Sequence, residues 1–197
     1  MANENHMAQA LELFRSFAGQ ERSENFAAAE APVGGQGERT VTVPHPYYLV
    51  GGDSVLKGSL EGAERLAGYQ SIIFQGDQPV EAPIAELAGE GISYLASWTP
   101  ETALALNGAL RVAEDQKRDT HDFAVVTVPE VGFTAVWLRQ RHELVPMATN
   151  RNRGALDPSR IYSEAEVIEA LRGPLEERLN IPRGGSAEEE LTEPPTA

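Results

Sequence analysis

The sequence contains no cysteine among its 197 residues. Disulfides, thiol catalysis, iron–sulfur clusters and thiolate zinc sites are therefore excluded. It also lacks any run of roughly 18 apolar residues, the length that a membrane-spanning helix needs. Basic residues are scarce, since 16 Lys and Arg stand against 30 Asp and Glu and give a formal net charge of −14. We expect no nucleic-acid partner, because nucleic acids are bound through concentrated Lys and Arg, and no membrane association.

The residues that are present are typical of a folded protein. Hydrophobic residues make up 41% of the chain and charged residues 23%, which is close to the average for globular proteins, and the length favours one compact domain. The start has no basic region followed by an apolar run, so no signal peptide is indicated and we expect a cytoplasmic protein. His6-Met7 is a pair that cloning often leaves at a vector junction, so residues 1–6 are either native or a vector remnant.

Three parts are expected along the chain. Residues 1–36 combine an amphipathic helix over residues 7–18 with a flexible linker rich in Gly, Ala and Pro, so the helix is predicted to be tethered rather than fused to the compact domain. The expected apolar face of this helix carries Met7, Leu11, Phe14 and Ala18. Residues 37–181 form the compact domain, and residues 182–197 form an acidic tail that is predicted to be disordered.

Apolar and β-branched runs predict the strands of the compact domain. The expected strands are residues 39–50, 69–74, 123–128, 133–138 and 144–148. Pro44 and Pro46 favour an edge strand or a bulge in the first of them, and Trp137 is predicted to lie in the core. The strands and helices do not alternate regularly. We therefore expect an α+β fold with a mainly antiparallel sheet and helices packed on one face.

Helices are predicted from their start signals. Thr99-Pro100-Glu101 combines a hydroxyl cap, a first-turn proline and an acid, and predicts a helix to about Gln116. Ser163 and Glu166 form a capping box, which predicts a final helix kinked near Gly173-Pro174. A weaker helix is expected over residues 59–66.

The second half of the chain carries a family resemblance. The runs Phe133-Thr-Ala-Val-Trp-Leu138, Glu143-Leu-Val-Pro-Met147 and Ile161-Tyr-Ser-Glu-Ala-Glu-Val-Ile168 resemble the carboxy-terminal half of short bacterial proteins of unassigned function. Those proteins show an aromatic-x-Ala-x-Trp-Leu strand, a strand ending in Pro and a small residue, and a final helix opened by Tyr-Ser/Asp-Glu. The resemblance covers residues 120–180 and implies a recurrent structural unit, but its motifs carry over no catalytic residue.

Known catalytic motifs are missing. No Gly-x-Ser-x-Gly nucleophile turn occurs, and the glycine-rich residues 34–37 lack the lysine and the adjoining helix of a phosphate loop. The histidines have no metal-ligand spacing, and they are His6, His45, His121 and His142. We therefore expect no cofactor and no metal site.

A basic segment in the acidic chain is the first candidate site. Residues 139–160 hold five arginines against two acids, so this segment is +3 while the rest of the chain sums to −17. The arginines are Arg139, Arg141, Arg151, Arg153 and Arg160. They either pair with neighbouring acids and water or form a contact surface for an anion or a carboxylate-bearing partner.

A second candidate is a groove beside His45, Tyr47 and Tyr48. Adjacent tyrosines on a strand point to opposite faces, so one can lie in the core while the other is exposed or lines a groove.

Two classes of function stay open. The first is a non-enzymatic accessory or protein-interaction protein of bacterial type, which binds a protein partner or self-associates through its helix, its edge strand or the basic segment. The second is a small hydrolase-like enzyme of unrecognised family that uses His45, His121, His142 and acidic residues. Histidines that share one cleft with a carboxylate favour the enzyme, and scattered histidines favour the interaction protein.

Overall fold

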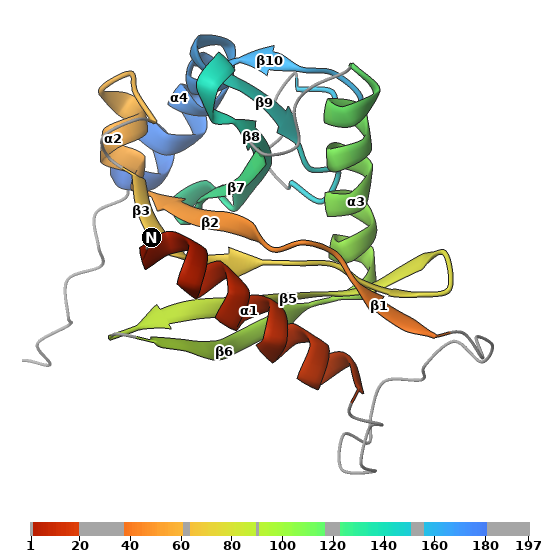
Figure 1. The fold of residues 1–197 in the computed structure, drawn as a ribbon. Coiled ribbons are helices and arrows are strands. Elements are labelled where there is room, and N and C mark those ends of the chain that lie inside the picture. The colour runs from red at the N-terminus through yellow and green to blue at the C-terminus, as the bar shows by residue number, and fades with distance from the viewer. Residues whose placement is uncertain are drawn as a thin grey trace, which may run out of the picture.

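The computed structural model describes residues 2–19, 38–60, 64–89, 91–116, 123–150 and 156–180. Ten strands of these residues form one sheet in the order β1-β4-β5-β3-β2-β7-β8-β9-β10, with β6 paired to β5 (Figure 1). Every strand pair is antiparallel except β2 with β7, which is parallel. The predicted α+β class with a mainly antiparallel sheet is confirmed.

The first half of the sheet is built from long hairpins. Its strands are β1 (Arg39–Val41), β2 (His45–Val50), β3 (Glu64–Gln70), β4 (Ile73–Gln75), β5 (Gln78–Ala88) and β6 (Gly91–Trp98). The helix expected over residues 59–66 is wrong, because Glu64, Arg65 and Leu66 pair with β2 in spite of their helical propensity. Strands β5 and β6 were not predicted, since prolines and acids interrupt the alternation of β5.

The proline-rich strand does not end up at an edge. β2 lies between β3 and β7. The short β1 that precedes it in the chain lies at an edge of the sheet, paired with β4. Pro46 pairs with Tyr69 of β3. The pairing of β2 with β7 begins one residue after Pro46, at Tyr47. The pairing register shifts opposite Tyr47 and Tyr48, but the extra residue is Ala67 of β3, so the bulge lies in the partner strand and not in the strand that contains the prolines.

The second half of the sheet agrees more closely with the prediction. β7 (Phe123–Val128) and β8 (Phe133–Leu138) form the expected hairpin through a 3-10 turn, which ends at Gly132 with φ +60°. β9 (Glu143–Pro146) adds the expected third strand, and β10 (Tyr162–Ser163) closes this edge. Trp137 is fully buried, which confirms the prediction that it lies in the core.

The helices are α1 (Ala2–Gly19), α2 (Gly52–Leu56), α3 (Pro100–Asp115) and α4 (Glu164–Asn180). Both start signals are confirmed. The Thr99 hydroxyl accepts a hydrogen bond from the backbone N–H of Thr102, and the Glu166 carboxylate accepts one from the N–H of Ser163. α4 continues through Pro174 to Asn180.

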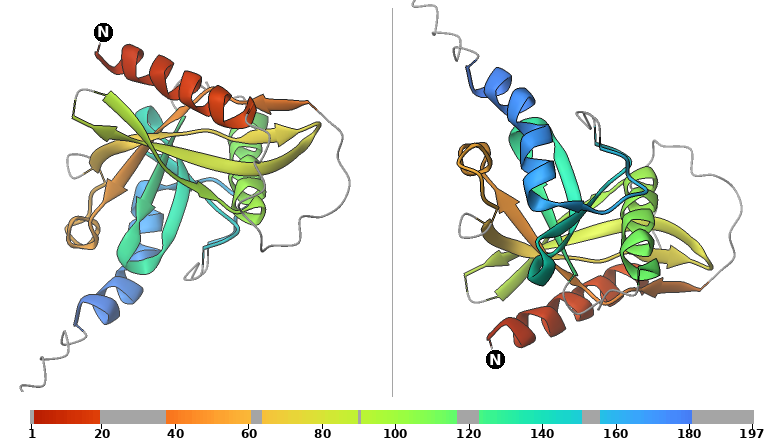
Figure 2. Two further views of the ribbon diagram at one scale, coloured as in Figure 1. Left: turned by 90° about the horizontal axis from the view of Figure 1, so that it is seen from below. Right: turned by 90° about the horizontal axis from the view of Figure 1, so that it is seen from above.

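Helices lie on both faces of the sheet, and the expectation of a single covered face is wrong. Val136 and Leu138 of β8 lie in the core beneath α3, whereas Phe133, Ala135 and Trp137 lie in the core beneath α2 and α4. Figure 2 shows α3 and α4 on opposite sides of β7 and β8. The physical reason is that β8 is apolar at almost every position, so both of its faces need a cover.

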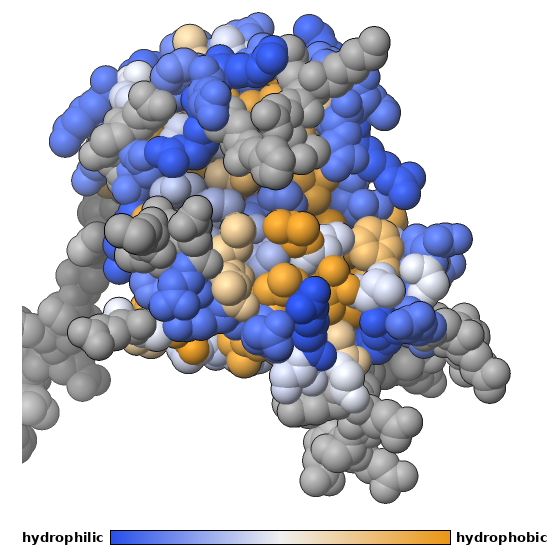
Figure 3. Space-filling view, in the orientation of Figure 1, coloured by the Kyte–Doolittle hydropathy of each residue, from blue (hydrophilic) through white to orange (hydrophobic). Residues whose placement is uncertain are grey.

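The first helix packs on the sheet and is not merely tethered. Ala10 and Phe14 are fully buried against Tyr69 and Ala85, while Met7 is 37% exposed. The residues of α1 that face the sheet are therefore shifted from the predicted face. On the side that Figure 3 shows, hydrophobic surface gathers between α1 and α3 and hydrophilic surface surrounds it. The predicted linker and acidic tail lie outside the described residues.

Within the described part of the chain, no helix combines the length and the apolar character needed to cross a membrane.

Candidate functional site

The two adjacent tyrosines point to opposite faces of β2, as predicted. Tyr47 is buried beneath α3, with its ring edge-on to Trp98 at a centroid distance of 6.1 Å. Burial raises the pKa of Tyr47, and a hydrogen bond with the Thr127 side chain opposes part of this effect. Tyr48 is half-buried on the other face, edge-on to Trp137 at 6.0 Å. Tyr47 is thus a core residue.

Arg139 is partly exposed and is bonded to two neighbouring side chains. Its Nη2 donates a hydrogen bond of 2.8 Å to the Glu64 carboxylate, and its Nη1 donates one of 2.9 Å to the Tyr48 hydroxyl. The guanidinium carbon also lies 5.1 Å from the ring centre of Trp137. Of the two interpretations of the basic segment, pairing with a neighbouring acid therefore holds for Arg139.

The other arginines of the basic segment differ from Arg139. Arg141 is exposed in the turn between β8 and β9. Arg151 and Arg153 lie outside the described residues. Arg160 is exposed, with its guanidinium carbon 5.3 Å from the ring centre of Tyr162. Among the described carboxylates, none lies within 4.0 Å of Arg160 to form an ion pair.

The described histidines do not share a site. His45 is half-buried beside Phe123, with a ring distance of 6.4 Å, and burial lowers its pKa. The Nδ1 atom of His142 lies 3.3 Å from a carboxylate oxygen of Glu164, whose other oxygen accepts a 2.7 Å hydrogen bond from the N–H of Leu60. His121 lies outside the described residues. No three His, Asp or Glu side chains of the described chain gather as metal ligands would.

An apolar groove of about 360 Å³ runs along α3. We call it the α3 groove. Among the described residues, its α3 wall includes Glu101, Leu104, Ala105, Gly108, Ala109 and Val112, and its opposite wall includes Pro146, Ala148, Thr149, Pro158 and Ser159. The Leu104 side chain is 59% exposed, and the space above Gly108 is open, with no atom within 4 Å of where a Cβ would stand.

The sequence of α3 explains why an apolar wall faces outward. Ala103, Leu106 and Leu110 have the 3- and 4-residue spacing of a buried face and lie in the core. Leu104, Gly108 and Val112 repeat every four residues on the neighbouring face, where Leu104 and Gly108 are exposed and Val112 is partly buried against the core. Leu104 is a large apolar residue at a position of α3 that does not face the core. Its presence there was the one sequence signal that could have revealed the groove.

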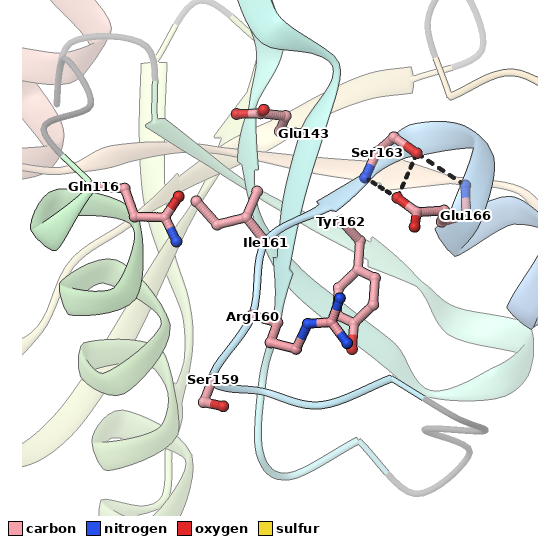
Figure 4. A pocket seen from close by; sticks show the side chains of 8 residues that line it. All are labelled: Gln116, Glu143, Ser159, Arg160, Ile161, Tyr162, Ser163 and Glu166. Atoms are coloured by element: carbon pink, nitrogen blue, oxygen red, sulfur yellow. Dashed lines mark hydrogen bonds between the residues drawn. The ribbon is translucent and has the colours of Figure 1, made fainter.

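A polar pocket of about 410 Å³ adjoins the α3 groove, and Ser159 lines both. The other residues of the polar pocket are Gln116, Glu143, Arg160, Ile161, Tyr162, Ser163 and Glu166. Figure 4 shows Gln116, at the end of α3, facing Ile161, while the Arg160 side chain lies against the Tyr162 ring. Apolar surface along α3 thus leads into a pocket whose described charged residues are Arg160, Glu143 and Glu166.

Two carboxylates near this junction are already engaged by local donors. The N–H and hydroxyl of Ser163 both donate to Glu166, and these hydrogen bonds lower the pKa of Glu166. The N–H and hydroxyl of Ser159 donate to Asp157 in the same way and lower its pKa. Both acids are therefore anchored to their own turns. The charge of Arg160 also lowers the pKa of both acids to a smaller extent, so its exposed guanidinium already has two carboxylates in its surroundings.

No family model, curated protein or solved structure matches the chain. The resemblance of residues 120–180 to short bacterial proteins stays a prediction, and function is inferred from the geometry of the described residues.

Proposed function

We propose that the chain is a non-enzymatic protein-interaction protein that binds a short segment of a partner in the α3 groove. The partner segment is acidic and carries a large aliphatic side chain. The observation that carries this proposal is the α3 groove itself, whose apolar walls include the 59% exposed Leu104 and whose end adjoins Arg160.

The apolar walls favour an aliphatic side chain in the partner. Full burial of one leucine side chain stabilises a complex by about 1.5–3 kcal/mol, and the partner's leucine and Leu104 would be buried together. Gly108 supports the same occupant, because a glycine in the middle of a helix lets another chain approach the helix backbone closely.

Charge favours acidic residues around that side chain. The segment from Arg139 to Arg160 carries +3 in the sequence, whereas the rest of the chain carries −17. Of its described arginines, Arg160 lines the polar pocket, and Arg139 is paired with Glu64 on the opposite face of the sheet. The described lining of the groove and of the pocket also includes Glu101, Glu143 and Glu166, so the attraction of an acidic segment depends on Arg160. Guanidinium groups such as that of Arg160 also form paired hydrogen bonds with carboxylates, which orient the bound segment.

A hydrolase-like activity receives less support. The closest described histidine and carboxylate, His142 and Glu164, line neither the α3 groove nor the polar pocket. Glu164 also holds the N–H of Leu60 through its second oxygen, which is the geometry of a loop anchor.

Fluorescence polarisation with a labelled peptide tests the proposal. The probe is a synthetic peptide with one leucine flanked by glutamates, and a matched peptide with alanine in place of leucine is its control. We expect saturable binding that Leu104→Asp weakens at least about tenfold. Leu95→Asp is the matched protein control, because Leu95 is 51% exposed on β6, away from the groove. Absence of binding, or equal losses in both variants, contradicts the proposal.

A further inference from the structure

Strand β6 has one long edge without a partner strand in the described part of the chain. Among the described strands, β6 (Gly91–Trp98) pairs only with β5, and Figure 1 shows it below β5 at the lower rim of the sheet. The other described edge strands are short, since β1 has three residues and β10 has two, whereas β6 has eight. The backbone N–H and C=O groups along the outer edge of β6 can therefore form hydrogen bonds with another chain.

The sequence of β6 lacks most of the features that keep edge strands from pairing. The run Gly-Ile-Ser-Tyr-Leu-Ala-Ser-Trp contains no charged residue and no proline. One protective feature is present, a bulge at Leu95, because Tyr94 pairs with Ala85 and Ala96 pairs with Ile84. At this bulge two large apolar side chains lie outside the core, Tyr94 with 40% and Leu95 with 51% of its surface exposed.

Helix α1 holds one of these two side chains in place. The Phe17 ring of α1 stacks on the Tyr94 ring, with a centroid distance of 4.9 Å and an interplanar angle of 22°. A ring that is already ordered loses little conformational entropy when a partner packs against it. The exposed surface at the middle of β6 is thus preorganised for a contact.

Charge and symmetry favour a second copy of this chain as the partner. Two chains with a net charge of −14 repel one another over most of their surfaces, so they approach most easily where charge is absent, as it is along β6. Tyr94 and Leu95 are the two central residues of β6. When a strand pairs antiparallel with its own copy about a two-fold axis, its centre meets the same centre in the other copy. The aromatic and aliphatic side chains of both copies then bury one another, as in stabilising cross-strand pairs.

We infer that two copies of the chain pair antiparallel through β6 and join their sheets into one. The contact is separate from the α3 groove, because no residue of β6 belongs to the described lining of that groove. Its dependence on salt is also opposite. Salt screens the repulsion between two acidic chains and should strengthen the dimer, whereas it should weaken the binding of an acidic segment beside Arg160.

Sedimentation equilibrium of the full chain tests the inference. Two paired strands make a small interface, so we expect the average mass to rise toward that of a dimer between about 1 μM and about 1 mM protein, and at lower concentrations when salt is added. Leu95→Lys places a positive charge at the centre of each β6, where the two charges meet, and should abolish the rise. Leu104→Lys is the matched control, since it makes the same change at a leucine that is 59% exposed on α3, and it should leave the rise unchanged.

A disulfide crosslink tests the same pairing without relying on the lysine variant. The chain has no cysteine, so Leu95→Cys introduces a single thiol per copy. Pairing about the strand centre brings the two thiols close enough to join, and mild oxidation should yield a covalent dimer. Leu104→Cys is the control and should stay monomeric under the same conditions.

Three results would overturn the inference. They are a wild-type chain that stays monomeric up to about 1 mM in high salt, a Leu95→Lys variant that associates as the wild type does, and equal crosslinking of the two thiol variants. None of them affects the proposed function, which the labelled peptide and Leu104→Asp test separately.

Discussion

The guanidinium carbon of Arg139 lies 4.7 Å from the ring centre of Tyr48, and the same guanidinium donates a hydrogen bond to the Tyr48 hydroxyl. The sequence suggested these residues as parts of two separate contact surfaces. The pairing of β2 with β7 and of β7 with β8 brings them together on one face of the sheet. A half-buried acid, Glu64, completes the cluster and makes Arg139 part of the fold.

Replacing Arg139 with alanine should destabilise the domain. The substitution leaves the Glu64 carboxylate, whose side chain is only 12% exposed, without its cation. We expect a loss of about 1–2 kcal/mol in the free energy of unfolding, modest because the Arg139 side chain is itself 36% exposed. Urea denaturation measures the loss. Arg141→Ala is the control, since Arg141 is exposed, and equal effects of both substitutions would place Arg139 in solvent.

The stability of the domain should depend on His45 at mildly acidic pH. Burial lowers the pKa of His45 below the ordinary value of 6.5, and a hydrogen bond with the Phe123 backbone opposes part of this shift. The unfolded chain therefore takes up a proton near pH 6.5 while the folded chain does not. Stability should fall as the pH drops from 6.5 toward the lower folded pKa. His45→Gln should flatten this part of the curve of unfolding free energy against pH, and an unchanged slope would contradict the assignment.

The parts of the fold that sequence patterns predicted are those fixed by local chemistry. Thr99-Pro100 and Ser163 with Glu166 cap their helices through bonds within one turn, and the apolar runs around Gly132 pair with each other across a short turn. β3 was harder to predict because it pairs with β2 and β5 rather than with β4, the strand that follows it in the chain, and β5 was harder because prolines and acids interrupt its alternation although it forms hairpins with β4 and β6. Contacts with β2 and β5 override the helical propensity of Glu64 to Leu66.

The candidate site was predicted less well than the fold. Sequence reasoning identified the basic segment that forms one wall of the groove, but it did not identify α3 as the other wall. The reason is that Leu104 and Val112 are ordinary helix residues until the packing of Leu106 and Leu110 shows which side of α3 faces the sheet. For Tyr47 and Tyr48 the alternation of a strand was enough to predict opposite faces.

Gly108→Gln should separate stability from binding. Gly108 lies within α3, where an added Cβ meets no atom within 4 Å, so glutamine fits the helix backbone and replaces a poor helix former. We expect the free energy of unfolding to rise by about 1 kcal/mol while the affinity for the acidic peptide falls. Gly173→Gln in α4 serves as the control for binding. A Gly108→Gln protein that binds the peptide normally would show that the ligand does not approach this part of α3.

Charge reversal of Arg151 and Arg153 to glutamate should affect binding and not folding. Exposed arginines contribute only about 0–1 kcal/mol each through surface pairs, so the melting temperature should barely change. The affinity for an acidic partner, or self-association, should fall, and the loss should shrink as salt is raised because screening already removes the attraction. Unfolding of the double variant would instead make these arginines internal partners of buried acids.

The most direct test of the α3 groove is a titration of the ¹⁵N-labelled protein with the glutamate-flanked leucine peptide, monitored through the backbone amide signals. If the peptide binds in the α3 groove, the amide signals that shift should belong to residues of its two walls, namely Leu104, Gly108, Val112, Thr149 and Ser159. Leu104→Asp should suppress these shifts. Signals that move instead on α1 and β6, around Tyr94, or a spectrum that does not change, would contradict the assignment of the α3 groove as the docking site.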